Sequence, residues 1–229
     1  MLVTNGPNRL VGPPRVWAIV VAAGTGTRFG GPKQFAVLGE ISVLARSVGT
    51  AAASVDGVVV VAALEHLERT RLDVAAVAAH AVVVAGDATR AGSVRNGLAA
   101  VPDDAAIVLV HDAARPLASR SLYAEVIAAV VAGADAVVPA IAVVDTIRSL
   151  DGGIVPRDRL VAVQTPQGFR AAALRTAHEG SPEATDDATL VEAIGGLVVV
   201  VPGAATNLKV TTPVDLVIAE ALLGLEERS

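Results

Sequence analysis

The sequence predicts an α/β fold, a three-layer sandwich with a mostly parallel sheet. Short, almost wholly apolar runs rich in β-branched residues alternate with longer Ala- and Leu-rich amphipathic segments. Strands buried on both faces of a parallel sheet have this apolar character, and right-handed helical crossovers connect them. No internal repeat and no linker long enough to separate domains interrupts the alternation. We therefore expect a single domain over residues 16–229, preceded by a disordered leader, residues 1–15.

The apolar runs are the predicted strands, because each is short and bounded by turn residues or charges. They are residues 16–22, 58–62, 81–85, 107–111, 136–140 and 197–201. The predicted helices lie near residues 41–53, 65–79, 90–100, 119–132, 184–194 and 213–226. In the third of these, Val94, Leu98 and Val101 recur at helical spacing, which predicts its buried face.

Residues 142–163 depart from the alternation and predict a β-hairpin. Two strand-like stretches flank Leu150-Asp-Gly-Gly153, and Asp-Gly is a strong hairpin signal. We expect this hairpin to protrude, because it cannot join the parallel sheet in sequence order. Two roles remain open: a surface excursion, or an arm that reaches a second subunit.

Composition excludes several classes of protein. The chain has 18 Lys and Arg against 23 Asp and Glu, a balance that argues against a nucleic-acid partner. Without cysteine there is no disulfide scaffold, thiol nucleophile or Cys-ligated metal. No apolar run approaches the ~20 residues of a membrane span, and the start lacks the apolar segment of a signal peptide. We expect a cytoplasmic protein with no membrane association.

Residues 22–34, directly after the first predicted strand, form a glycine-rich loop. Backbone N–H groups unobstructed by side chains suit phosphate oxygens. The loop is not a Walker A motif, because Pro32 precedes Lys33 and Gln34 stands where a Ser or Thr is required. It is also not a dinucleotide fingerprint, because Gly24-x-Gly26-x-x-x-Gly30 is one residue too long.

Two cations, Arg28 and Lys33, lie on this loop, and Pro32 stiffens the turn before the lysine. Cations placed in advance stabilise the negative charge that spreads over phosphate oxygens during phosphoryl or nucleotidyl transfer. The alternative is that Arg28 and Lys33 merely solvate a surface loop.

Ala22-Ala-Gly-x-Gly-x-Arg28 followed by Pro32-Lys-Gln34 resembles the nucleotidyltransferase superfamily, and more narrowly the 2-C-methyl-D-erythritol 4-phosphate cytidylyltransferase (IspD) family. The resemblance covers about residues 16 to 224 in order. Four further segments agree: Arg90–Val94, Val110–Pro116, Gln164–Gln167 and Asn207–Thr211.

This resemblance implies a Rossmann-like nucleotidyltransferase sandwich with a protruding β-hairpin arm. It implies cytidylyl transfer from CTP to the polyol phosphate 2-C-methyl-D-erythritol 4-phosphate, with release of pyrophosphate, in the non-mevalonate route to isoprenoid precursors. It also implies a homodimer formed through the arm.

Asp112 directly follows the fourth predicted strand, and the carboxyl ends of strands line the ligand crevice of open α/β sheets. Mg²⁺ prefers one or two carboxylates together with phosphates and water. The resemblance assigns Asp112 to Mg²⁺ or another divalent cation. The alternatives are a helix N-cap and a partner for Arg115. His111 we expect to be structural.

The other site residues rest on the resemblance. It implies catalysis by Arg28, Lys33 and Lys209, which neutralise phosphate charge. It implies CTP binding by Ala22, Ala23, Gly24, Gly26, Arg90 and Ser93. Since Arg90 and Ser93 begin a predicted helix, we expect the guanidinium and the hydroxyl to be exposed on the crevice side.

Four residues match family positions that hold the polyol phosphate: Thr146, Arg157, Thr165 and Thr185. A guanidinium binds a phosphate monoester bidentately, which favours this role for Arg157. Thr146 and Arg157 belong to the hairpin, which the family exchanges between subunits. Thr185 could instead be a helix N-cap, because Asp186 and Asp187 follow it.

Other activities remain open at the level of the residues. A ribitol-5-phosphate cytidylyltransferase would share the loop, the aspartate and the lysine. A related enzyme could use ATP, GTP or UTP. A nucleotide-sensing module without turnover is the alternative of another class.

Overall fold

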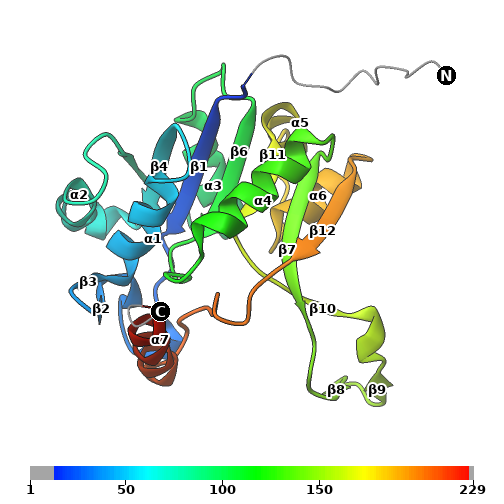
Figure 1. The fold of residues 1–229 in the computed structure, drawn as a ribbon. Coiled ribbons are helices and arrows are strands. Elements are labelled where there is room, and N and C mark those ends of the chain that lie inside the picture. Colours follow the sequence, from blue (N-terminus) through cyan, green and yellow to red (C-terminus); the bar gives the residue numbers. More distant parts are fainter. Residues whose placement is uncertain (1–12, 227–229) are drawn as a thin grey trace.

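The computed structural model describes residues 13–226, which fold around one eight-stranded sheet (Figure 1). β1 (Val16–Ala22) lies at its centre, parallel to β4 (Gly57–Ala62) on one side and to β6 (Ile107–Asp112) on the other. β5 (Val82–Ala85) continues the sheet beyond β4, again in parallel. The mostly parallel sheet is as predicted.

The other half of the sheet contains the antiparallel strands. β7 (Ala136–Ala142) is parallel to β12 (Val198–Pro202), and β11 (Gln167–Arg170) runs antiparallel between β7 and β6. β11 was not predicted, because Gln-Gly-Phe-Arg is short and has neither an apolar run nor an alternation. The six predicted strands all exist, with bounds shifted by two residues at most.

Helices cover both faces of the sheet, which gives the predicted three layers (Figure 1). Alternate residues of β1 face opposite ways: Ala18 and Val20 pack into one core, and Ile19 into the other. The first core is covered by α1 (Val43–Ala52), α2 (Leu67–Ala75) and α4 (Arg120–Val131). The second is covered by α3 (Arg90–Ala99), α5 (Ala171–Ala177) and α6 (Asp187–Ala193).

A third, smaller apolar cluster lies beside the carboxyl end of the sheet. It joins α7 (Pro213–Glu226) to the short hairpin of β2 (Val37–Leu38) and β3 (Ile41–Ser42). Leu38 and Ala219 are fully buried in this cluster. The contact fixes the segment before α7 relative to the glycine loop.

The predicted arm protrudes from the sheet (Figure 1). Its hairpin is shorter than expected: β8 (Ile147–Arg148) pairs with β9 (Ile154–Val155) over two residues each. The expectation that the segment stays apart from the sheet is wrong at its base. There β10 (Val161–Val163) pairs antiparallel with β7.

The predicted leader, residues 1–15, lies largely outside the described residues. Its last residue, Arg15, belongs to the fold: its carbonyl accepts hydrogen bonds from the N–H groups of Ala106 and Ile107, and its guanidinium pairs with Asp104. The boundary at residue 15 was therefore placed too late. Within residues 13–226, no helix is long and apolar enough to cross a membrane.

Candidate active site

A cleft of about 420 Å³ opens at the carboxyl ends of the central strands. Four segments form its wall: the glycine loop after β1, the start of α3, the end of β6 and the segment before α7. All residues predicted for catalysis, CTP and metal line it: Ala22, Ala23, Gly24, Gly26, Arg28, Lys33, Arg90, Ser93, Asp112 and Lys209. The fold thus brings together residues that are far apart in the sequence.

The glycine loop is shaped by Gly26, whose φ of 67° is left-handed. Its carbonyl accepts hydrogen bonds from the N–H groups of Phe29 and Gly30 at 2.9 and 3.1 Å, which closes a compact turn. A Cβ atom at Gly26 would lie 2.0 Å from the carbonyl oxygen of Gly31, so no other residue fits. A second short turn, Lys33–Phe35, then places Lys33 in the cleft.

The pKa of Lys33 reflects the cations that surround it in the cleft. Burial lowers its pKa, and the charges of Lys209 and Arg28 lower it further, while Asp112 acts in the opposite direction. Arg28, Lys33 and Lys209 are neighbouring cations that repel one another. A bound polyanion relieves this repulsion, so such a cluster binds a polyanion well. The cleft therefore suits a polyphosphate.

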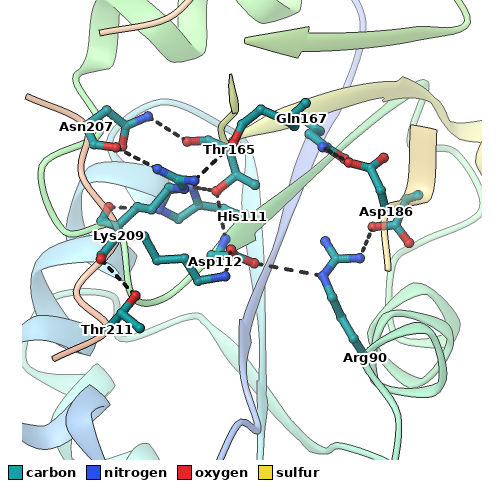
Figure 2. Close-up of polar contacts among 12 residues, drawn as sticks. Arg90, His111, Asp112, Thr165, Gln167, Asp186, Asn207, Lys209 and Thr211 are labelled. Atoms are coloured by element: carbon teal, nitrogen blue, oxygen red, sulfur yellow. Dashed lines mark hydrogen bonds and ion pairs between the residues drawn. The ribbon is translucent and has the colours of Figure 1, made fainter. Parts of the chain in front are cut away.

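Asp112 is held between two cations (Figure 2). Its Oδ2 accepts from Lys209 Nζ at 2.6 Å, and its Oδ1 lies 3.9 Å from Arg90 Nε. Burial alone would raise the pKa of Asp112, but Lys209 and then Arg90 outweigh it and lower that pKa. The carboxylate is therefore ionised and held in one orientation. Neither alternative role applies, because the Asp112 side chain caps no helix and forms no ion pair with Arg115.

Asp112 also decides whether a divalent cation fits. Within residues 13–226, no cluster of three or more His, Asp or Glu side chains could hold a metal on its own. The Asp112 carboxylate, in a cleft lined by cations, fits Mg²⁺, which takes one or two protein carboxylates and completes its shell with phosphate oxygens and water. The residues present therefore suit a metal that arrives with a nucleotide.

Lys209 is positioned by a buried amide network. Asn207 Nδ2 donates to the carbonyl oxygen of Thr165 at 2.9 Å and to Gln164 Oε1 at 3.2 Å. Gln164 in turn exchanges two hydrogen bonds with the backbone of Ala204, at 2.8 and 3.1 Å. The segment that carries Lys209 is therefore fastened to the loop between β10 and β11, which follows the arm.

Arg115 reinforces this connection from a third segment. Its Nη1 donates to the carbonyl oxygen of Asn207 at 2.7 Å, and its Nη2 to that of Val163 at 3.1 Å. Three of the motifs noted in the sequence, around residues 110–116, 164–167 and 207–211, are thus bonded to one another. These hydrogen bonds explain how three motifs that are distant in the sequence form one part of the site.

The start of α3 differs in one respect from expectation. Thr89 caps the helix, its Oγ1 accepting from the N–H of Gly92 at 2.9 Å, and Arg90 faces the cleft. Ser93 also lines the cleft, but it is 1% exposed and its Oγ accepts from the N–H of Asp87 at 3.0 Å. The expected exposed hydroxyl is wrong, because the preceding loop folds back over it.

Thr165 supports Asp112 from behind and does not line the cleft. Its Oγ1 accepts from the N–H of Asp112 at 3.0 Å and lies 3.1 Å from His111 Nδ1. His111 Nε2 faces the carbonyl oxygen of Arg115 at 3.2 Å, so Nε2 carries the ring proton and Nδ1 accepts from the Thr165 hydroxyl. Burial lowers the pKa of His111 to about 4, which supports its predicted structural role.

The remaining predicted polyol-phosphate residues also lie outside the nucleotide cleft. Thr146 and Arg157 are exposed on the arm, where the guanidinium of Arg157 donates to the carbonyl oxygen of Val144. Thr185 is exposed, and its alternative role as helix cap is wrong, because Asp186 caps α6 by accepting from the N–H of Ala188 at 2.7 Å.

Several cleft residues were missed by the sequence reasoning. Asp87 and Thr89 follow the strand β5, Gln34 follows Lys33, and Thr211 follows Lys209. The rule that carboxyl ends of strands line the crevice could have found Asp87. Gln34 and Thr211 lie inside motifs that carry the resemblance, but no role was assigned to them, and Thr89 has no signal beyond adjacency to Arg90.

The chain is similar to known proteins over most of its length. A family model described as 2-C-methyl-D-erythritol 4-phosphate cytidylyltransferase matches residues 16–225. A protein of that name from Frankia casuarinae is 48% identical over 93% of this chain and 83% of its own length. Another from Rhodococcus opacus is 47% identical over 91% of this chain and 95% of its own.

Solved structures give the same result. The crystal structure of 2-C-methyl-D-erythritol 4-phosphate cytidylyltransferase from Thermus thermophilus is 37% identical, with a TM-score of 0.75. The similarity covers 91% of this chain and 98% of that one. Sequence and fold therefore point to one family over nearly the whole length.

Proposed function

The chain belongs to the 2-C-methyl-D-erythritol 4-phosphate cytidylyltransferase family, and on that premise we propose how its cleft acts. It is a nucleotidyltransferase that moves the cytidylyl group of CTP to 2-C-methyl-D-erythritol 4-phosphate and releases pyrophosphate. One observation supports this most: Arg28, Lys33, Lys209 and Asp112 share a single cleft beside the glycine loop.

The triphosphate of CTP lies over residues 22–34, against Arg28 and Lys33. An oxygen of the acceptor's phosphate attacks the α-phosphorus in line, the new P–O bond forms, and the bond to the β-phosphate oxygen breaks. The attacking phosphate is ionised at neutral pH, so no general base is required. Catalysis then consists of positioning and charge stabilisation by Arg28, Lys33 and Lys209.

Nucleotide recognition belongs to the start of the glycine loop and to the start of α3. Ala22, Ala23 and Gly24 approach the nucleotide with their backbone, and Ser93 and Arg90 close the pocket from α3. A small pocket with a few fixed polar groups excludes a purine by size. The hydrogen bond between Ser93 and Asp87 supports this role, since it holds the pocket wall in one position.

A divalent cation, Mg²⁺ or a similar ion, is part of the proposal. Asp112 would hold it together with phosphate oxygens, and the ion would supply further neutralisation of the triphosphate charge. Lys209 and Arg90 keep the Asp112 carboxylate ionised and directed into the cleft.

The acceptor is held across a homodimer. Thr146 and Arg157 project from the arm into the neighbouring subunit's site, where Arg157 binds the acceptor phosphate. Thr185 completes the pocket, and the buried Thr165 supports it from behind Asp112. Exposed apolar side chains on the arm support a partner: Val144 is 78% exposed and Ile154 59%. We also propose that the enzyme works in the cytoplasm, where CTP is available.

Pyrophosphate release tests the function. Purified protein is incubated with Mg²⁺, one of CTP, ATP, GTP or UTP, and either 2-C-methyl-D-erythritol 4-phosphate or ribitol 5-phosphate, and the product mass is measured. We expect pyrophosphate to be released at a substantial rate only when CTP is combined with 2-C-methyl-D-erythritol 4-phosphate. Preference for ribitol phosphate would move the enzyme to that alternative activity, and no release with any pair would contradict the assignment.

A further inference from the structure

A chain of charged contacts runs from the protein interior to the cleft, through a residue that the reaction described above does not use. Asp187, the first residue of α6, has a side chain only 1% exposed. Its Oδ1 lies 3.1 Å from His178 Nε2, and its Oδ2 accepts from Arg90 Nη1 at 2.6 Å. Arg90 then reaches Asp112, whose Oδ1 is 3.9 Å from Nε (Figure 2).

Arg90 needs such a partner because of its position. It is the first residue of α3, where the helix dipole is positive and disfavours a cation, and the first turn has no acidic residue. Arg90 is nevertheless largely buried, with its side chain 27% exposed. Two carboxylates balance the charge of Arg90: Asp187, which lies outside the cleft lining, and Asp112, which lines the cleft.

The Asp187 side chain is itself held in place by its contacts. Burial disfavours its charge, yet the hydrogen bond from His178 and the charge of Arg90 lower its pKa below the usual value. His178 ends α5 and is buried, so its ring is held by packing. The adjacent Asp186 caps α6 and accepts from Gln167 Nε2 at 2.7 Å, which fastens the helix start to β11.

We propose that Asp187 is a positioning residue: held by His178, it fixes the Arg90 guanidinium in the cleft wall, where Arg90 orients Asp112 and receives the nucleotide triphosphate. The Nη1 side of the guanidinium is bound to Asp187, so the Nε side is directed toward Asp112. An arginine bonded in this way has lost its freedom before the ligand arrives, and affinity gains from that preorganisation. This inference rests on the proposed CTP site.

The test is a double-substitution cycle on CTP binding, with Asp187→Asn, Arg90→Met and the two together. Asparagine keeps the shape of Asp187 and removes its charge. We expect Asp187→Asn to raise the dissociation constant for CTP about tenfold, the size of effect of a charged hydrogen bond, and to leave KM for the acceptor unchanged. In the Arg90→Met background, Asp187→Asn should raise it no further.

Two other variants separate positioning from general damage. His178→Gln should weaken CTP binding in the same direction but less, since it acts one contact further away. Asp104→Asn is the matched control. Its carboxylate pairs with Arg15 across a similar sequence distance, but neither residue lines the cleft, and CTP binding should not change.

Unfolding in urea supplies a readout that does not depend on the reaction. Arg90→Met leaves the Asp187 carboxylate buried beside His178 alone, so adding Asp187→Asn should recover part of the lost stability. Independent, additive effects of the two substitutions on unfolding would overturn the contact chain. Additive effects on CTP binding, or no effect of Asp187→Asn, would overturn the positioning role.

The same preparations distinguish this inference from the proposed function. If the wild-type protein does not bind CTP, the proposed function fails, and the positioning role fails with it, although coupling in the unfolding data would still establish the contacts. If the wild type binds and turns over CTP but the cycle is additive, the function stands and the inference alone fails.

Discussion

The nucleotide cleft and the arm are built in opposite ways. Cleft residues come from four segments, and contacts between three of them hold Asp112: Lys209 donates a hydrogen bond to one of its oxygens, and Arg90 lies 3.9 Å from the other. The arm has two short strands of two residues each and exposes both Thr146 and Arg157. It also exposes large apolar side chains, with Leu150 wholly accessible.

This difference indicates which parts of the site one chain completes alone. In the cleft, Lys209 and Arg90 already hold the Asp112 carboxylate in place, so we expect one chain to bind a triphosphate without help. The arm residues lack such support, and exposed apolar groups of this kind commonly mark contacts with another protein. Substitutions in the two regions should therefore change different kinetic constants.

Lys33→Ala should have the largest effect. Lys33 lies in the cleft between Arg28 and Lys209, and its contact with the phosphates should strengthen as charge builds in the transition state. We expect kcat to fall about 10²- to 10³-fold, the usual cost of one electrostatic stabiliser, with a smaller change in KM for CTP. Steady-state kinetics with a check of the urea unfolding curve measures this. An unchanged kcat would contradict the catalytic role.

Arg157→Ala should have a smaller and different effect. Removing a guanidinium that binds the acceptor phosphate should raise KM for the acceptor about tenfold and leave CTP binding alone. Arg159→Ala is the control, because both residues are exposed in the same short turn, Arg157–Arg159. Weaker CTP binding in Arg157→Ala would place this residue at the nucleotide instead.

The pH dependence should show the smallest effect. Since Lys33 must be protonated to stabilise the phosphates and its pKa is lowered from 10.5, kcat/KM for CTP should fall as the pH rises through a value below 10.5. In Lys33→Arg this decline should move to higher pH, because arginine remains charged. A decline at the same pH in both proteins would assign it to another group.

The sequence predicted the cleft better than the arm for a physical reason. Gly26 and Lys33 follow β1, Asp112 is the last residue of β6, and the geometry of a parallel sheet brings strand ends to one edge whatever the surrounding details. β11 was not predicted, because its four residues do not reveal that it pairs between β6 and β7 in the assembled sheet.

Other features depended on tertiary contacts that no local pattern encodes. The burial of the Ser93 hydroxyl follows from a bond to Asp87, and the Arg90–Asp187 pair joins residues 97 positions apart. Asp187 has no periodicity or spacing to distinguish it from an ordinary residue at a helix start. Thr165 was predicted from the resemblance to hold the polyol phosphate, and its buried position behind Asp112 could be seen only in the fold.

The central claim is that one chain's cleft works with another chain's arm, and a mixed dimer tests it most directly. A chain with Lys33→Ala and a chain with Thr146→Val and Arg157→Ala are co-expressed with different tags, and the heterodimer is isolated through both. Its pyrophosphate release is measured with the acceptor well below KM. If the arm serves the neighbouring cleft, one site is intact, and the heterodimer should show about half of the wild-type activity. Activity no greater than half that of the arm variant, or the absence of any heterodimer, would contradict the account.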